Sequence, residues 1–489
     1  MRMRYVLVLL CAGAMPAAAW ADVKPHAICS EGMVLQQKSK AKIWGTAANG
    51  ENVSIAFRGN TASTVADAQG RWVVEVATGE AGGPFEMTIG GNNKIVYKNI
   101  LVGEVWVCSG QSNMEWTVNG CDKTDKERAT SAPHNAMLRV FNVAKNPQAN
   151  PLAYTKGNWI EADPKTVGGF TATGYFFGRH LQENMKVPVG LIHTSWGGTR
   201  IETWMSKEAL DPYEKQGDKV GANSASNLYN GMIYPILNYN VKGAVWYQGE
   251  SNAGQAYKYR ALHNAMIENW RKDFHNPDLA FHFVQLAPYT AVAKTPGDSN
   301  WAELREAQMM TLAKLKNTGM AVITDFGDEA DIHPSPKRWA GERLGLAARG
   351  VTYGEKIVYS GPMYKSAKFD GAKATLTFDH VGGGLITKEI EQTPSRNANA
   401  KNAFAWRVKE GSTNAPLIGF TAAGKDQKFH NAKAEIVGST VVVTSDAVTD
   451  VVAVRYGWAN HPVCNLYNRE GLPASPFRTD EFRGITQPK

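Results

Sequence analysis

The sequence has 489 residues, of which 43% are hydrophobic, 20% are charged and 10% are aromatic. This composition is ordinary for globular proteins, and it excludes a disordered chain or a coiled coil because both classes are poor in aromatic side chains. The formal charge of +8 is spread without any long basic run, so nucleic-acid binding is not indicated. A chain of this length is expected to form two or three domains.

The first 21 residues have the pattern of a secretory signal peptide. Two arginines precede an apolar run over residues 5–12, and mostly small residues lead to Ala21, after which we expect cleavage. A lipoprotein signal would need a small residue before Cys11, where this sequence has leucine. No later apolar run approaches the roughly 20 residues of a membrane helix. We therefore expect an exported protein, periplasmic or secreted, without membrane insertion.

Four cysteines follow the signal segment: Cys29, Cys108, Cys121 and Cys464. Export permits disulfides. Their spacing, however, indicates neither a zinc cluster nor a disulfide scaffold, and it leaves the pairing open. Because no group of His, Cys, Asp and Glu has metal-ligand spacing either, the sequence predicts no metal and no cofactor.

Residues 22–101 read as an N-terminal β domain. Short runs alternate between apolar and polar residues and are separated by Gly and Asn turns, as at 42–44, 53–57 and 72–76.

Residues 102–355 have a different pattern, in which short apolar runs alternate with longer helical stretches. The runs typical of buried strands are 104–108, 189–194, 243–247, 281–285 and 320–324, and helices are predicted at 175–185 and 257–274. Strands that alternate with helices in this way indicate an α/β domain built on a parallel sheet.

Residues 356–489 return to strand-like alternation and are predicted to form a C-terminal β-rich region. The runs 434–437 and 440–443 flank Gly438-Ser439, which predicts a hairpin.

The segment from Glu104 to Trp116 carries the strongest chemical signal. A buried strand runs into Gly110, which permits a sharp turn, and Ser112 then falls at the start of a helix. This position lies at the carboxyl end of the sheet, where open α/β folds bind ligands. A serine there could act as a nucleophile, with its backbone N–H facing a developing oxyanion. The alternative is that Ser112 only caps the helix.

A serine nucleophile needs a base, and His333 is the histidine that fits best. The segment 331–334 follows the strand predicted at 320–324 and precedes a helix predicted at 338–349, so it also lies in a carboxyl-end loop. His193 lies inside an apolar strand and is expected to be a core histidine.

Two further loops at strand ends could complete a site. Residues 195–199 contain the Gly197-Gly198 pair, whose backbone N–H groups have no side-chain cover. Residues 246–252 offer the amide of Gln248 as a donor.

Taken together and in this order, the four segments resemble the SGNH hydrolases, specifically the sialate O-acetylesterase family. The specific motifs are Gly-Gln-Ser-Asn-Met at 110–114 and Trp-Tyr-Gln-Gly-Glu at 246–250, and the likeness continues at 227–233 and from 464 to 480. It implies an SGNH-hydrolase-like parallel sheet flanked by helices, between N-terminal and C-terminal β regions. It also implies Ser112 as nucleophile and His333 as base.

The same resemblance implies the remaining parts of the site. The oxyanion hole would comprise the N–H groups of Ser112, Gly197 and Gly198, with Gln248 in place of the asparagine that many SGNH enzymes use. Gln111, Arg200 and Glu250 are the candidate substrate-binding residues. Arg200 could pair with a sialate carboxylate, although an exposed arginine is more often only solvated.

One departure from the SGNH pattern concerns the acid that orients the histidine. The pattern has Asp three residues before the catalytic His, and this sequence has Ala330 there. Asp331 is the favoured replacement. Asp328, Glu329 and a backbone carbonyl remain alternatives, the last leaving a Ser-His dyad.

The sequence therefore predicts an exported serine esterase that removes O-acetyl groups from sialic acids through an acyl-enzyme. An esterase acting on acetylated xylan or another polysaccharide is the enzymatic alternative. A noncatalytic glycan-binding protein, in which Trp and Tyr stack on sugars, is the alternative of another class. The partner is a small-molecule or glycan substrate, and the sequence leaves the oligomeric state open.

Overall fold

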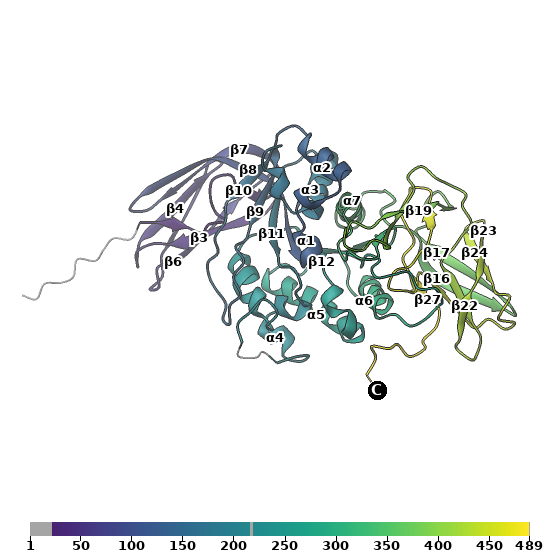
Figure 1. Cartoon of the computed structure of the whole chain (residues 1–489). Coiled ribbons are helices and arrows are strands. Elements are labelled where there is room, and N and C mark those ends of the chain that lie inside the picture. The colour runs from purple at the N-terminus through teal and green to yellow at the C-terminus, as the bar shows by residue number, and fades with distance from the viewer. Residues whose placement is uncertain (1–21, 216–218, 489) are drawn as a thin grey trace, which may run out of the picture.

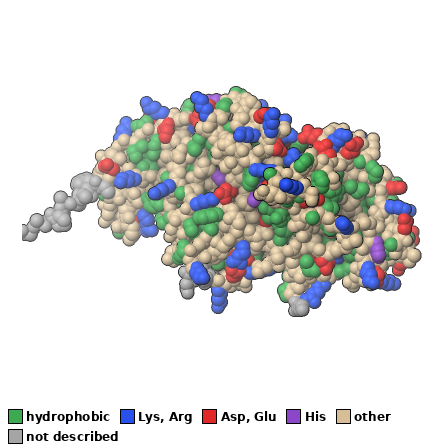
Figure 2. All heavy atoms as spheres, viewed as in Figure 1, with side chains coloured by type: hydrophobic (Ala, Val, Ile, Leu, Met, Phe, Trp, Pro, Cys, Tyr) green, Lys and Arg blue, Asp and Glu red, His purple; other side chains and the backbone are tan. Residues whose placement is uncertain are grey.

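A computed structural model describes residues 22–215 and 219–488. Three regions follow one another along the molecule, with N-terminal strands at one end, a central sheet with helices, and C-terminal strands at the other end (Figure 1). The predicted signal peptide lies outside the described residues. Lys, Arg, Asp and Glu are interspersed over the face shown in Figure 2. No helix in the described ranges is long and apolar enough to cross a membrane.

The N-terminal region consists of short strands whose side chains alternate between buried and exposed, as the sequence pattern predicts. β6 is buried at every second residue because only one of its faces meets the core. β3 pairs with β1 and β6, while β4 pairs with β5 and β7. The strands are β1 Lys24–Pro25, β2 Val34–Gln36, β3 Lys40–Thr46, β4 Asn52–Phe57, β5 Asn60–Val65, β6 Arg71–Ala77 and β7 Gly82–Gly90.

β8, at Lys94–Gly110, belongs to both the N-terminal region and the central sheet. Its first half pairs with β7 and alternates in burial, whereas from residue 100 onward every side chain is buried. The predicted domain boundary between residues 101 and 102 therefore falls inside one continuous strand. The sequence pattern changes there because the strand passes from having one covered face to having two.

The central sheet has the strand order β10-β9-β11-β8-β12-β13-β14, and all of its neighbours are parallel except β10 with β9. After β8 the chain forms β9 and β10 on one side of it, returns to β11 next to β8, and then adds β12, β13 and β14 on the other side, so β8 lies where the strand order reverses. Ligands bind outside the carboxyl ends of the strands at such a point. The further strands are β9 Asn135–Asn142, β10 Trp159–Ala162, β11 Val189–Ser195, β12 Gly243–Tyr247, β13 Ala280–Val284 and β14 Thr318–Ala321.

Helices cover both faces of this sheet. α3 (Ala172–Met185) and α7 (Arg338–Ala347) pack together over one core, while α5 (Ala256–Asp273) and α6 (Asn300–Lys314) belong to the other. Side chains of one strand enter the two cores alternately, as Val245 and Trp246 do. The shorter helices are α1 Ser112–Glu115, α2 Lys123–Thr130 and α4 Lys207–Leu210. The predicted α/β class with flanking β regions is confirmed.

The C-terminal β region has its own apolar core and contains the predicted hairpin as β23 and β24. It also joins the central α/β region directly, because β15 follows β14 and pairs with β20, which pairs with β19. The strands are β15 Phe326–Asp328, β16 Met363–Asp370, β17 Lys373–Asp379, β18 Leu385–Thr387, β19 Ile390–Pro394, β20 Phe404–Val408, β21 Phe420–Ala423, β22 Phe429–Asn431, β23 Lys433–Val437, β24 Thr440–Thr444, β25 Ala453–Tyr456, β26 Leu466–Asn468 and β27 Phe477–Arg478.

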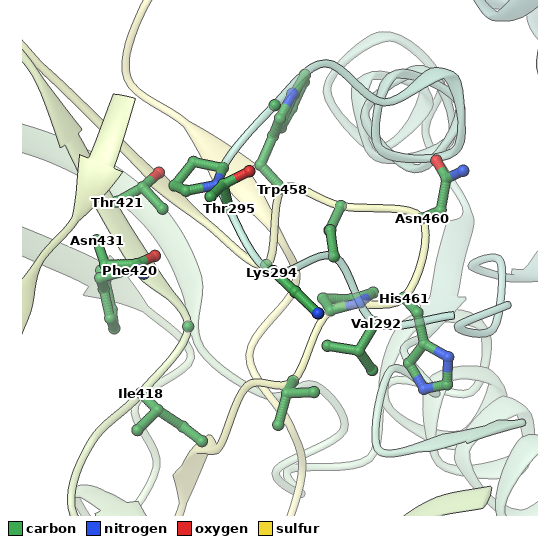
Figure 3. Close-up of a pocket in the computed structure, with 18 of the residues that line it drawn as sticks. Val292, Lys294, Thr295, Ile418, Phe420, Thr421, Asn431, Trp458, Asn460 and His461 are labelled. Carbon is green, nitrogen blue, oxygen red and sulfur yellow. The ribbon is translucent and has the colours of Figure 1, made fainter. Parts of the chain in front are cut away.

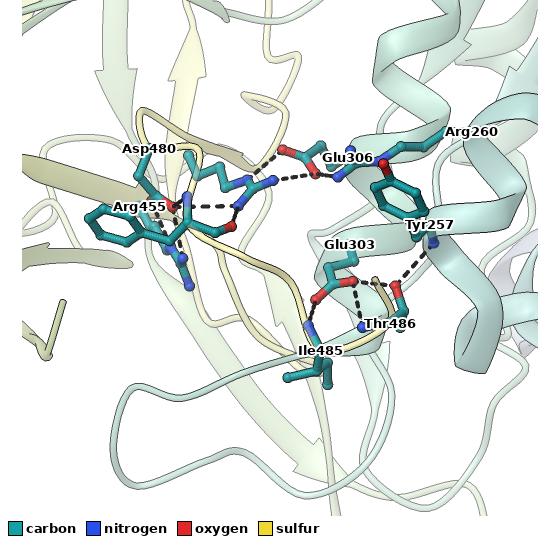
Figure 4. A network of polar contacts seen from close by, with 10 residues as sticks. Tyr257, Arg260, Glu303, Glu306, Arg455, Asp480, Ile485 and Thr486 are labelled. Carbon is teal, nitrogen blue, oxygen red and sulfur yellow. Dashed lines mark hydrogen bonds and ion pairs between the residues drawn. The ribbon is translucent and has the colours of Figure 1, made fainter. Parts of the chain in front are cut away.

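The last residues of the chain hold the C-terminal region against α6 (Figure 4). Arg478 donates to Glu306 at 2.6 Å, and the backbone N–H of Ile485 donates to Glu303 at 2.6 Å. Thr486 donates to the same Glu303 carboxylate. Two carboxylates of one helix thus fix the orientation of the final segment.

Candidate active site

The turn after β8 depends on Gly110, which has a φ of +138°. A Cβ at this position would lie 2.2 Å from the carbonyl oxygen of Tyr247. Gln111 is the N-cap of the short helix α1, and Ser112 is its first residue. Ser112 is therefore not the cap, and its N–H has no partner inside the helix.

Ser112, His333 and Asp331 form a continuous chain of hydrogen bonds. Nε2 of His333 lies 2.9 Å from Oγ of Ser112, and Nδ1 lies 3.1 Å from Oδ1 of Asp331. The same Oδ1 accepts the backbone N–H of His333 at 2.9 Å. Because the carboxylate accepts the proton on Nδ1, Nε2 is left to accept the serine hydroxyl.

The pKa of the Asp331 carboxyl lies below its ordinary value. Burial by itself would raise this pKa, but the hydrogen bonds and charge of His333 outweigh that effect. Asp331 therefore remains a carboxylate beside the imidazole at neutral pH.

Asp328 and Glu329 hold the loop that carries His333 in place and do not contact the imidazole. The Asp328 carboxylate accepts the N–H groups of Ala330 and Asp331 at 2.9 and 3.1 Å. Glu329 accepts the indole N–H of Trp406 at 2.9 Å and a backbone N–H of β20. Of the three acids considered from the sequence, only Asp331 is within hydrogen-bond reach of the imidazole.

His193 is held inside the sheet, as the sequence predicts. Its ring nitrogens contact Asn142 and Ser195 at 2.9 and 2.6 Å. Burial lowers its pKa to about 4, so the ring is neutral. Because both ring nitrogens are engaged by Asn142 and Ser195, neither is bonded to the Ser112 hydroxyl.

A second polar network lies next to the serine. Asn113 donates to the Glu250 carboxylate and to the carbonyl of Ile332, and it accepts a hydrogen bond from Lys337. Burial raises the pKa of Glu250 and lowers that of Lys337 to about 8. Glu250, a predicted substrate-binding residue, thus accepts a hydrogen bond from helix α1.

The loop after β11 lies close to the serine but offers fewer donors than expected. A Cβ at Gly197 would lie 3.2 Å from the Cβ of Ser112, yet the Gly197 N–H already donates to Glu115 at 2.6 Å. Gly198 is exposed, and its N–H has no hydrogen-bond partner in the described part of the chain.

Gln248 does not face the site. Its amide donates to the Thr199 carbonyl at 3.1 Å and to Asn252 at 2.7 Å, and it is completely buried. Both amide hydrogens are therefore used inside the fold. The amide of Gln111, beside Ser112, has no acceptor within the residues described, while its oxygen accepts the Ser251 N–H at 3.3 Å.

Arg200 is also committed to other groups. Its guanidinium donates to Glu214 at 3.0 and 3.4 Å and lies 3.6 Å from Glu202. Two carboxylates thus neutralise the cation that the sequence suggested for a sialate carboxylate.

Two residues near His333 were not anticipated from the sequence. The Trp116 ring stacks on the imidazole with centroids 4.8 Å apart, and Arg396 lies over the same indole at 4.6 Å. Trp116 belongs to the Ser112 motif and could have been noticed there. Arg396 comes from the C-terminal region, and no sequence signal links it to the site.

A separate cavity of about 510 Å³ lies between residues 290–298 and the C-terminal region (Figure 3). Lys294, Asn431 and Trp458 are among its lining residues, and none of the Ser112, His333 and Asp331 group is. Among the residues described, no group of three His, Cys, Asp or Glu side chains is placed to hold a metal ion. The four cysteines in the described part of the chain are free thiols.

Comparison with known proteins gives consistent matches. Residues 102–348 match the family described as carbohydrate esterase, sialic acid-specific acetylesterase. A carbohydrate acetylesterase from Xanthomonas citri has a crystal structure similar to this chain, with a TM-score of 0.82 and 40% identity over 94% of this chain and 100% of that one. Two sialate O-acetylesterases are 29% identical: the one from Homo sapiens over 95% of both chains, and the one from Mus musculus over 93% of this chain and 94% of that protein.

Proposed function

The chain belongs to the carbohydrate esterase family of sialic acid-specific acetylesterases, and from this premise we propose that it removes O-acetyl groups from sialic acids with Ser112 as nucleophile. The observation that carries the serine mechanism is the hydrogen-bonded series from Ser112 through His333 to Asp331 at the carboxyl edge of the sheet. Family membership makes the protein an esterase and sets aside the noncatalytic glycan-binding alternative.

In the first half of the reaction, His333 removes the proton from Ser112 as Oγ attacks the acetyl carbonyl. Asp331 stabilises the imidazolium that forms, because its carboxylate lies 3.1 Å from Nδ1. The tetrahedral intermediate collapses when His333 returns the proton to the departing sugar oxygen. Water then attacks the acetyl-serine with His333 again as base, and acetate leaves.

The oxyanion is stabilised by donors that the protein does not already use. The N–H of Ser112 is the first of helix α1 and has no acceptor inside the helix. The N–H of Gly198 and the side-chain amide of Gln111 have no acceptor among the residues described. Such donors favour the transition state because they are oriented before charge develops. This assignment replaces Gly197 and Gln248, whose hydrogens are engaged elsewhere.

The class of glycan on which the enzyme acts calls for a direct test. The family and the animal relatives favour O-acetylated sialic acid, and the bacterial relative is named only as a carbohydrate acetylesterase. Acetate release should be measured from O-acetylated N-acetylneuraminic acid, acetylated xylan and p-nitrophenyl acetate, with Ser112→Ala as control. We expect the highest kcat/KM among the sugars on sialate and none of these activities in the variant. Release from xylan alone would refute the sialate assignment, and an active Ser112→Ala enzyme would refute the mechanism.

We also propose that the protein is exported from the cytoplasm. The first 21 residues carry the charge and hydropathy pattern of a signal peptide. Sequencing the amino terminus of the protein recovered from the cell exterior or periplasm should give a chain that begins near Asp22. An unprocessed terminus on protein retained in the cytoplasm would refute export.

A further inference from the structure

The C-terminal β region places a turn directly on the catalytic loop. The Asp328 carboxylate, which already binds two N–H groups of that loop, also accepts the Ser395 hydroxyl at 2.6 Å and the Arg396 N–H at 3.0 Å. Asn397 adds a hydrogen bond to the carbonyl of Ala330 at 3.3 Å. Asp328 is 4% exposed, so this connection is shielded from water and the turn is held in place.

This turn places the guanidinium of Arg396 on the indole of Trp116, which also contacts the catalytic histidine. Its Cζ lies 4.6 Å from the Trp116 ring, which in turn stacks on His333. The charge also acts on the site, since it contributes to lowering the pKa of Asp331. Arg396 and His333 line a common small pocket beside β15.

No carboxylate among the described residues neutralises the positive charge of Arg396. The side chain is exposed, and within the described ranges it has no carboxylate within salt-bridge distance. Of the five N–H donors of its guanidinium, one is used, in a hydrogen bond to the Gly120 carbonyl at 2.9 Å. The nearby acids are committed, because Asp331 binds His333 and Asp328 binds four donors.

Other cations near the site differ from Arg396 in this respect. Lys145 is paired with Glu115, and Arg407 lies 3.7 Å from Asp122. Lys337 is buried under the catalytic loop, where burial lowers its pKa. Among the described cations near the site, Arg396 is thus the one that is exposed, unpaired with a carboxylate and able to offer several free N–H donors.

We propose that Arg396 determines substrate specificity by binding the carboxylate of the sugar whose acetyl ester is attacked by Ser112. This inference rests on the proposed function, and it names the feature of the substrate that the site reads. A planar guanidinium with free N–H groups binds a carboxylate through two parallel hydrogen bonds. In an acetylated acidic sugar the carboxylate and the ester are parts of one monosaccharide, so the binding cation must lie near the nucleophile.

The test compares Arg396→Gln, Arg396→Lys and wild type on matched substrates. The substrates are O-acetylated N-acetylneuraminic acid, the same sugar with its carboxylate converted to the primary amide, and p-nitrophenyl acetate. We expect Arg396→Gln to raise KM for the acid by roughly tenfold or more and to change KM for the other two by less than about twofold. Arg396→Lys should be intermediate, since it keeps the charge and loses the fork. Arg469→Gln removes an exposed arginine elsewhere in the C-terminal region and should change nothing.

The outcomes separate this inference from the function on which it rests. An equal loss on all three substrates would show that Arg396 only supports Trp116 and would refute the proposal. So would a wild-type enzyme that does not distinguish the acid from the amide, although it would remain an esterase. A wild-type enzyme that releases acetate from p-nitrophenyl acetate and xylan and not from the acid would refute the sialate function itself.

Discussion

Asp331→Asn is the change that most directly tests the catalytic arrangement, because it removes a charge and keeps the shape. In wild type, one oxygen of Asp331 accepts both the backbone N–H and the Nδ1–H of His333. The amide oxygen of asparagine should take the same place, since flipping the amide would turn its NH₂ group toward the backbone N–H. The neutral tautomer of His333 should therefore survive, and the loss should be mainly electrostatic.

The size of that loss follows from the distance. At 3.1 Å, an imidazolium and a carboxylate attract by about 5 kcal/mol at an effective dielectric constant of about 20, and by about half as much where water doubles that constant. The two side chains are 24% and 19% exposed, which places the pair between these limits. Since about 1.4 kcal/mol corresponds to a tenfold change in rate, kcat should fall by about 10² to 10⁴.

The assay is steady-state hydrolysis of p-nitrophenyl acetate at neutral pH, with thermal unfolding as a check on the fold. Glu329→Gln is the matched control, because it is also isosteric and its carboxylate binds β20 instead of the imidazole. The control should stay within about tenfold of wild type. An Asp331→Asn enzyme within about threefold of wild type would refute the role of Asp331 in orienting and stabilising His333.

Four further outcomes are expected. Ser112→Ala and His333→Ala should each lower kcat by about 10⁴ to 10⁶, and the double variant should be no worse, because nucleophile and base act as one unit; additive losses in the same assay would contradict this. Asp328→Asn should lower both the melting temperature and kcat, since an amide cannot accept from the donors on both carboxylate oxygens; an unchanged variant would contradict the anchoring role. The buried Lys337 has a pKa of about 8 against an ordinary 10.5, so its charge lowers the free energy of unfolding by up to about 3 kcal/mol below pH 8 and has no such effect above about pH 10.5. Wild type therefore gains stability between these pH values and Lys337→Met does not, so the stability of the variant relative to wild type, measured by urea unfolding, should fall across that range. EDTA should leave acetate release unchanged, since no group of metal ligands is present in the described part of the chain.

That Ser112 and His333 lie together could be predicted, because their proximity depends on a general property of α/β sheets. Ser112 and His333 both follow buried strands, and the carboxyl ends of parallel strands meet at one edge. The acid that orients His333 was harder to predict, because this sequence has Ala330 at the position where SGNH hydrolases usually have Asp. Only the loop geometry shows which of its carboxylates reaches the ring.

The oxyanion and substrate residues could not be settled from the sequence, because it does not show which acceptor takes a given hydrogen. Gly197 and Gln248 lie in the expected loops, yet Glu115 and Asn252 accept their hydrogens. Arg396 lies in a β region whose docking depends on tertiary contacts, and no local periodicity encodes them.

The continuity of β8 bears on how the protein unfolds. The first part of the strand is hydrogen-bonded to the N-terminal sheet, and the part that leads to Ser112 is hydrogen-bonded to the parallel strands β11 and β12. A chain that started at residue 102 would begin in the middle of this ladder, without β2 and β7, which pair with β8, and without core side chains such as Leu101. We therefore expect the N-terminal and central regions to unfold in one cooperative transition, so that a destabilising change in the first hundred residues also loosens the turn that holds Ser112.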